Sequence, residues 1–307
     1  MADIRVSSWS ELQERLYAGS WQEGLRRFRS NLAFRGMVDA ASDLTTSLVR
    51  LVGSQQGKPE THLLRNFRKY ARRDSVPGDS VWNWLALAQH HGLPTRLLDW
   101  TFSPYVALHF ATETLETYSR DGVVWCVDYA RAHALLPQPL REALEQENAD
   151  VFTAEMLGRV ADSLSKFDAL GKKHPFVVFF EPPSLDDRIV NQFALFSLMS
   201  SPAADLDSWL ADHPKIWQRL IIPASLKWEV RDKLDQANVT ERVLFPGLDG
   251  LSRWLKRYYS PRTDSPPAGP QTPEGQRVAP RPGPDYSVKV EQESQPPRKT
   301  AKRRPRQ

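Results

Sequence analysis

The stretch that most constrains this chain is His90-His91-Gly92-Leu93-Pro94-Thr95-Arg96-Leu97-Leu98-Asp99-Trp100-Thr101. It places two imidazoles, a guanidinium, a carboxylate and two hydroxyl groups within twelve residues, and Gly92 and Pro94 interrupt regular backbone structure. Apolar residues recur at helical spacing on both sides, over residues 80–90 and 104–115, which predicts a polar loop between two buried helices. Rigid flanking elements hold loop side chains in place, so we expect a binding or catalytic site here.

A second candidate lies upstream, at Phe34-Arg35-Gly36. Residues 27–34 alternate in part between polar and apolar side chains, which predicts a strand that ends at Arg35-Gly36. A guanidinium fixed at a strand end can bind phosphate or carboxylate bidentately, and a glycine lets a ligand approach the backbone closely. The alternative interpretation is a surface arginine before a turn. If both segments form one site, the loop at residues 90–101 must fold back over this strand end.

Strands and helices follow one another without regular alternation in the rest of the chain. Apolar runs predict strands at residues 123–127, 176–180, 194–199 and 216–222. Helical spacing predicts helices at residues 10–18, 45–51, 61–72, 139–147, 149–168, 225–237 and 248–259. The mixture predicts an α+β fold, a single mixed domain with a central sheet flanked by helices. We expect a helical lead-in at residues 1–24, the α+β domain at residues 25–260 and a tail at residues 261–307.

The tail differs from the rest of the chain in composition. Residues 261–307 hold 11 of the 24 prolines, none of the 10 tryptophans, and 10 Lys or Arg against 5 Asp or Glu. The tail therefore carries a net charge of +5 and residues 1–260 carry −1, which together give the net charge of +4 of the whole chain. It cannot bury enough apolar surface to offset the entropy of ordering, which predicts disorder. The basic cluster at residues 298–306 is either a solvated tail or a weak contact for nucleic acid or another polyanion.

Several classes of site are disfavoured. Cys126 is the single cysteine and lies in an apolar run, so we expect a small buried hydrophobe and not a nucleophile. His90 and His91 are adjacent and would point about 100° apart on a helix, so they cannot chelate one ion together, and no metal cofactor is expected. A lone cysteine, no apolar run of membrane-spanning length and no signal segment predict a cytoplasmic protein without a membrane partner.

Other polar residues leave alternatives open. Arg96 and Asp99 are close enough in sequence to form a local ion pair, or Asp99 is an acid–base carboxylate. Arg188 and Gln192 are four residues apart and share a helix face, which is either an exposed polar face or part of a site.

These segments together resemble the FRG domain, a bacterial family named for its Phe/Tyr-Arg-Gly motif. The matching segments are Phe34-Arg35-Gly36, residues 89–101, Ser103-Pro104, residues 107–111, and Arg188-Ile189 with Gln192 and Phe196. Where the family usually has glycine between that glutamine and phenylalanine, this chain has Ala194. The resemblance covers about residues 25–255 and does not include the tail.

A weaker resemblance to ADP-ribosyltransferase folds implies an NAD site. It implies that Arg35 holds the pyrophosphate or the nicotinamide ribose of NAD. The binding residues expected are Arg35, Gly36, His90, His91, Thr95, Arg96 and Arg188, and the catalytic residues expected are Arg35, His91, Asp99 and Gln192. The acidic residue that such enzymes carry late in the chain falls near Gln192, which has no charge to stabilise an oxocarbenium-like centre. Glu181 or Asp99 would have to supply that charge instead.

Three functions are therefore open. The first is an NAD-handling enzyme, an ADP-ribosyltransferase or an NAD glycohydrolase, with NAD as substrate and no metal. The second is a non-catalytic module that senses a nucleotide or phosphate through the same residues. The third is an interaction protein that binds nucleic acid through its basic tail.

Overall fold

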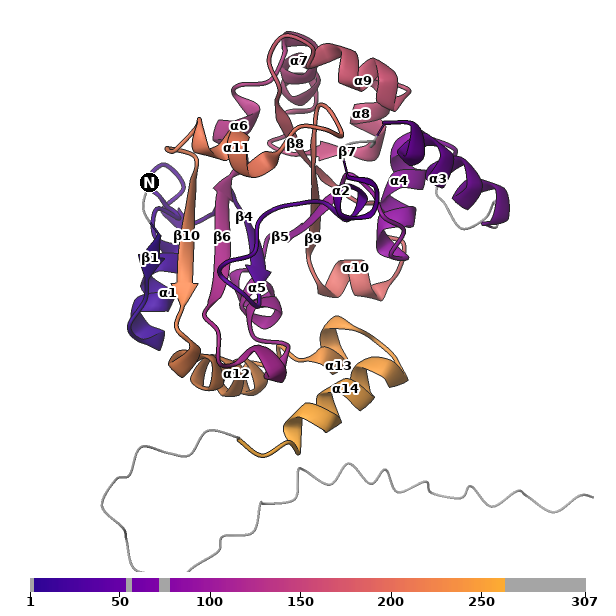
Figure 1. The fold of residues 1–307 in the computed structure, drawn as a ribbon. Coiled ribbons are helices and arrows are strands. Elements are labelled where there is room, and N and C mark those ends of the chain that lie inside the picture. The colour runs from indigo at the N-terminus through magenta and orange to yellow at the C-terminus, as the bar shows by residue number, and fades with distance from the viewer. Residues whose placement is uncertain (1–2, 54–56, 72–77, 263–307) are drawn as a thin grey trace, which may run out of the picture. The chain divides into compact units, whose positions relative to one another are not determined.

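The computed structural model describes residues 3–53, 57–71 and 78–262. Residues 1–260 form one compact unit. Within the described residues, an eight-stranded mixed sheet is flanked by helices (Figure 1), which confirms the predicted α+β class. The tail that the sequence predicts to be disordered lies outside the described residues, apart from Pro261 and Arg262.

The sheet has the strand order β1-β10-β6-β4-β5-β9-β8-β7. In that order the strands are Ile4–Arg5, Trp217–Ile222, Gly122–Asp128, Leu32–Met37, Leu98–Thr101, Ala194–Met199, Val177–Glu181 and Phe152–Thr153. The edge pairs β1–β10 and β7–β8 are parallel, and the inner pairs are antiparallel. A separate hairpin pairs β2, Trp21–Gln22, with β3, Arg27–Phe28.

The helices account for most of the remaining regular structure. Their bounds are α1 Trp9–Tyr17, α2 Ser47–Val52, α3 Gly57–Tyr70, α4 Val81–His90, α5 Pro104–Ala111, α6 Tyr129–His133, α7 Gln138–Glu147, α8 Ala154–Val160, α9 Leu164–Leu170, α10 Asp187–Asn191, α11 Leu206–Ala211, α12 Lys227–Gln236, α13 Glu241–Leu244 and α14 Leu248–Tyr258. The two helices beside the polar loop begin at caps that the sequence indicates: Ser80 accepts from Asn83 N, and Ser103 accepts from Val106 N. No helix in the described ranges is both long enough and apolar enough to cross a membrane.

The two faces of the sheet are buried against different helices. In β6, Val123 and Trp125 join the apolar cluster under α6 and α11, whereas Val124 and Cys126 join the cluster under α1, α5 and α12. This period of two is what a strand buried on both faces requires. On the face that Val124 and Cys126 occupy, here called the second face, the helices α3, α4, α7, α8 and α9 form another cluster with β8 and β9. The second face is therefore covered by two separate groups of helices.

Four predicted elements differ from the structure. The segment predicted as a polar loop at residues 90–101 ends in the strand β5, because residues 98–101 pair with β9. The strand predicted at residues 27–34 is two strands, and β4 continues through Arg35 and Gly36 to Met37, because β6 pairs with it along that whole length. The helix predicted at residues 149–168 is β7, α8 and α9, since Thr153 and Ser163 each cap a new helix. The lead-in expected at residues 1–24 contains β1, which forms an edge of the main sheet, and the hairpin strand β2.

Candidate functional site

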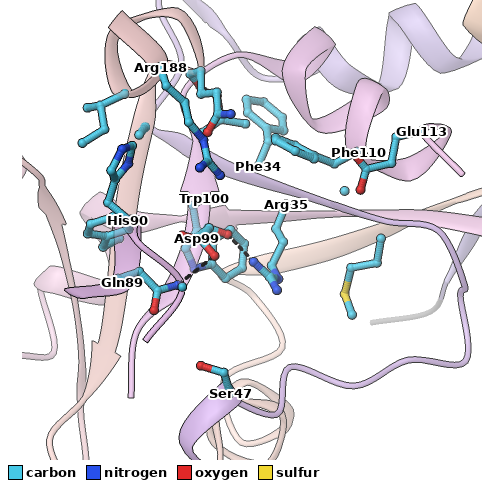
Figure 2. A pocket seen from close by; sticks show the side chains of 18 of the residues that line it. Phe34, Arg35, Ser47, Gln89, His90, Asp99, Trp100, Phe110, Glu113 and Arg188 are labelled. Carbon is cyan, nitrogen blue, oxygen red and sulfur yellow. Dashed lines mark hydrogen bonds between the residues drawn. The ribbon is translucent and has the colours of Figure 1, made fainter. Parts of the chain in front are cut away.

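The main cavity lies where the central sheet separates. β4 and β5 are paired at one position only, Phe34 with Thr101, whereas β4 pairs with β6 at six positions and β5 with β9 at four. Beyond that single pair the strands diverge, and both of them line a cavity of about 800 Å³. The ends of α4 and α5, together with α10 and β9, contribute the other walls (Figure 2).

Arg35 connects the two diverging strands. It follows Phe34, the β4 residue that pairs with β5, and its Nη1 donates a hydrogen bond of 2.5 Å to the backbone oxygen of Asp99 on β5. The predicted proximity of the polar loop to the Phe-Arg-Gly segment is thereby confirmed. Burial lowers the pKa of Arg35, and Arg50 acts in the same direction while Asp99 opposes it. Its Nε is buried and has no hydrogen-bond partner in the described residues.

Gly36 has a packing role that the sequence did not indicate. A Cβ built on this residue would lie 1.7 Å from the backbone oxygen of Ala107 and 2.8 Å from the nitrogen of Ala111. The glycine therefore allows α5 to pack directly on β4. The sequence predicts that this glycine lets a ligand approach the backbone. Gly36 does line the cavity, but the close approach is made by the helix.

Arg96 lies in a buried ion cluster and does not line the cavity. Its guanidinium donates to both carboxylate oxygens of Glu60 and to Asp168, and its side chain is 4% exposed. The local pair with Asp99 that the sequence suggested is not formed. With its donors engaged by two carboxylates, Arg96 serves to hold α3 and α9 against the loop.

Thr95 is also a structural residue of the loop. Thr95 is buried. Its hydroxyl donates a hydrogen bond to Gln89 Oε1 at 2.5 Å and accepts one from Leu97 N at 3.0 Å. Its backbone exchanges hydrogen bonds with Ser47 at the start of α2. Thr95 and Arg96 are thus the two expected binding residues that the structure places outside the cavity wall.

The two histidines stand at the end of α4 and both line the cavity. His90 Nε2 lies 2.8 Å from Asp186 Oδ2, and because a carboxylate only accepts, this nitrogen is the donor. Burial lowers the pKa of His90, although Asp186 opposes the shift. His91 is exposed, and its ring centroid lies 5.1 Å from that of His90.

Arg188 and Gln192 approach the cavity from α10 and the residue after it. The guanidinium of Arg188 stacks on Phe245 at 5.0 Å, and its Nε is buried without a hydrogen-bond partner in the described residues. Gln192 donates from Nε2 to the backbone oxygen of Leu244 at 3.0 Å, so its side chain ties α13 to the site. This contact gives the polar side chain at this position a structural role.

Two carboxyl groups, those of Asp99 and Glu113, line the cavity, and the sequence indicates only Asp99. Asp99 lines the cavity, and its side chain accepts from Gln89 Nε2 at 2.9 Å. Glu181, the other expected source of charge, ends β8 and is not among the lining residues. The residue that sequence reasoning missed is Glu113, which lines the cavity just beyond α5. Burial raises its pKa to about 7. The sequence signal that could have indicated Glu113 is its position four residues after His109, since such a spacing brings two side chains together on a helix.

Arg35 and Arg188 bring positive charge to the cavity, which Asp99 and Glu113 also line. Neither arginine side chain forms an ion pair with an acidic residue in the described part of the chain. Their planar donor groups match the geometry of phosphate or carboxylate. Groups of three or more His, Cys, Asp or Glu side chains suited to a metal ion do not occur among the described residues.

Comparison with known proteins supports one assignment. No curated protein and no solved structure gave a significant match. Residues 30–120 match the FRG domain, and this range contains β4, the polar loop and α5, which supply most of the cavity wall. Arg188 and Gln192 lie after the matched range. The chain is therefore an FRG domain-containing protein, with its FRG domain at residues 30–120.

Proposed function

We propose that the cavity between β4 and β5 binds a phosphorylated nucleotide, and that the protein is an NAD-handling enzyme of the ADP-ribosyltransferase or NAD glycohydrolase type. The observation that carries this proposal is the pair of arginines, Arg35 and Arg188, that face the cavity without an acidic partner. Both side chains are half-buried, and the Nε of each is buried without a hydrogen-bond partner in the described residues. Guanidinium groups that are partly removed from water are normally paired with an anion, and we infer that a ligand supplies the negative charge here.

The size and chemistry of the wall suit such a ligand. A volume of about 800 Å³ lies within the range of cofactor sites, roughly 300–1,000 Å³. Half-buried Phe110 offers an aromatic face for a base or a nicotinamide ring, as in base-stacking sites. His91 is exposed beside the cavity and can donate to a ribose hydroxyl or phosphate.

Binding of NAD to the purified protein, measured by calorimetry, tests the first half of the proposal. Arg188→Met removes one anchor, and Arg141→Met, on the exposed face of α7, is the matched control. A charge-assisted hydrogen bond contributes about 1.5–3 kcal/mol, so Arg188→Met should weaken binding about tenfold or more. Arg35→Met should weaken it similarly. No binding at millimolar NAD, or equal binding by all forms, would refute the proposal.

Nicotinamide release, followed by chromatography with and without a protein acceptor, tests the second half. Release that disappears in Arg35→Met establishes NAD chemistry in this cavity. Transfer of ADP-ribose to the acceptor distinguishes a transferase from a glycohydrolase.

A second candidate function is a non-catalytic nucleotide sensor. The observation that favours it is Gln192, which stands near the position where the ADP-ribosyltransferase resemblance expects an acid and which bonds to Leu244 instead. On this alternative, NAD or another nucleotide raises the melting temperature of the wild type and no product forms. Turnover of any nucleotide would exclude it.

A further inference from the structure

Glu113 is a carboxyl group in the cavity wall, and the side chain of His109 lies beside it. Glu113 follows α5 by two residues, and Figure 2 shows it at the same cavity as Arg35 and Arg188. Its Oε2 lies 3.9 Å from His109 Nε2, which is beyond hydrogen-bond distance. It forms no ion pair with Lys or Arg in the described part of the chain.

The state of His109 follows from its other contact. The ring is fully buried, and Arg231 Nη1 lies 2.8 Å from its Nδ1. Arginine only donates, so Nδ1 is an acceptor and carries no proton. Burial, together with the Arg231 charge, lowers the pKa of His109 to about 3, so the ring is neutral and its proton is on Nε2. This buried Nε2–H group has no hydrogen-bond partner in the described residues, and Glu113 Oε2 lies 3.9 Å from its nitrogen.

We propose that Glu113 is the acid–base residue of the cavity, and that His109 is a positioning residue whose Nε2–H group orients and stabilises the Glu113 carboxylate. This inference rests on the proposed function. A small rotation of Glu113 would close the 3.9 Å gap to a hydrogen bond and satisfy the buried donor. Arg231 contributes by holding His109 in the required tautomer.

The reaction can be written with Glu113 as general base. The bond between ribose C1′ and the nicotinamide nitrogen breaks, and its electron pair neutralises the pyridinium ring. Water forms the new C1′–O bond and transfers one proton to the Glu113 carboxylate, which returns it to solvent. NAD⁺ and water thus give ADP-ribose, nicotinamide and one proton. A base of this kind contributes about 10²–10⁴ in rate.

Charged groups on four elements shift the pKa of Glu113: Arg188 on α10, Arg231 on α12, Glu241 on α13 and Arg253 on α14. The neutral ring of His109 on α5 also faces it. Burial and Glu241 favour the protonated form, and the three arginines oppose them, which leaves the pKa at about 7. Glu113 therefore exchanges its proton in the pH range where a general base is effective.

The test compares Glu113→Gln with Glu116→Gln, an exposed carboxylate three residues away. Nicotinamide release by the wild type should rise with pH to a midpoint near 7. Glu113→Gln should reduce release about 100-fold or more with little change in NAD affinity. Glu116→Gln should match the wild type. Release by Glu113→Gln within threefold of the wild type would overturn the inference.

The role of His109 is tested by two substitutions. His109→Asn keeps an acceptor for Arg231 and loses the donor toward Glu113, so the midpoint should move to higher pH. His109→Gln places an amide donor near the Nε2 position and should restore it. A purely structural role would lower the melting temperature of both variants and leave the midpoint unchanged, which would overturn the positioning role.

A carboxyl titration separates this inference from the proposed function. With glutamate ¹³Cδ labels, the wild type should show one signal that titrates near neutral pH, and Glu113→Gln should lack it. If NAD is neither bound nor cleaved but this signal is present and moves in His109→Asn, the NAD proposal fails and the proton-exchanging pair stands. If the signal is absent, the inference is overturned whatever NAD does.

Discussion

Gly36→Ala separates the two explanations for the glycine of the Phe-Arg-Gly segment. In the structure the added Cβ would lie 1.7 Å from the backbone oxygen of Ala107, and real Cβ contacts essentially never fall below 3.0 Å. β4 cannot yield, because β6 pairs with it through residues 32–37. α5 would have to move outward, and its residues Ala107 and Leu108 are fully buried.

The magnitude follows from that displacement. Overpacking a well-packed core costs about 1–3 kcal/mol, and a backbone clash of this depth belongs at or above the upper end. We expect Gly36→Ala to lose about 3 kcal/mol or more of unfolding free energy. In a domain of this size, this lowers the melting temperature by roughly 6–12 °C.

Thermal unfolding followed by circular dichroism measures the effect. Gly24→Ala is the matched control, since a Cβ there meets nothing within 4 Å, and it should stay within about 0.5 kcal/mol of the wild type. If Gly36→Ala unfolds within about 2 °C of the wild type and loses only ligand affinity, our packing argument is wrong. The glycine would then serve the ligand.

Three further predictions concern parts of the chain away from the cavity. Arg96→Met leaves the buried Glu60 carboxylate without its counter-charge and should remove about 3–5 kcal/mol of unfolding free energy in urea titrations; an unchanged midpoint would contradict this. Burial opposes ionisation of Glu241, but hydrogen bonds from Arg257 hold its pKa at about 2, so this pair stabilises the fold fully above about pH 4.5 and loses that effect as the pH falls toward 2. Glu241→Gln should flatten this part of the curve of unfolding free energy against pH, and a curve parallel to that of the wild type would count against the assignment. Deletion of residues 261–307 should abolish any salt-sensitive binding of DNA or RNA, and equal binding by full-length and shortened protein would exclude the tail as the contact.

Local patterns predicted the elements around the site well. The strand at residues 194–199 is β9, and the serine caps at Ser80 and Ser103 begin α4 and α5 as the sequence indicates. These features depend on a few neighbouring residues, since a cap bonds within its own first turn and a strand period shows over six residues. The convergence of residues 90–101 on β4 followed from the hypothesis that the two polar segments form one site, and the hydrogen bond from Arg35 to Asp99 O agrees with it.

Partners distant in sequence could not be predicted. Arg96 pairs with Glu60 and Asp168, which are 36 and 72 residues away, and nothing beside Arg96 indicates them. Asp99, three residues away, is the candidate ion-pair partner that the sequence offers for Arg96. Its side chain instead accepts from Gln89 and lines the cavity. Glu113 escaped notice for a related reason. Its significance depends on burial and on its distance from His109, neither of which a single sequence reveals.

Two buried arginines, Arg96 and Arg257, differ in their partners from the two half-buried arginines at the cavity, Arg35 and Arg188. Arg96 meets Glu60 and Asp168, and Arg257 meets Asp235 and Glu241. Those two side chains are satisfied within the fold, as the high cost of burying a charge requires. Arg35 donates to a backbone oxygen and Arg188 stacks on Phe245, and neither forms an ion pair in the described part of the chain, although Asp99 and Glu113 interact with them at longer range. Among the described residues, the fold pairs one set of guanidinium groups with two carboxylates each and leaves the other set facing an open cavity, and on this contrast rests our proposal that the cavity binds an anionic ligand.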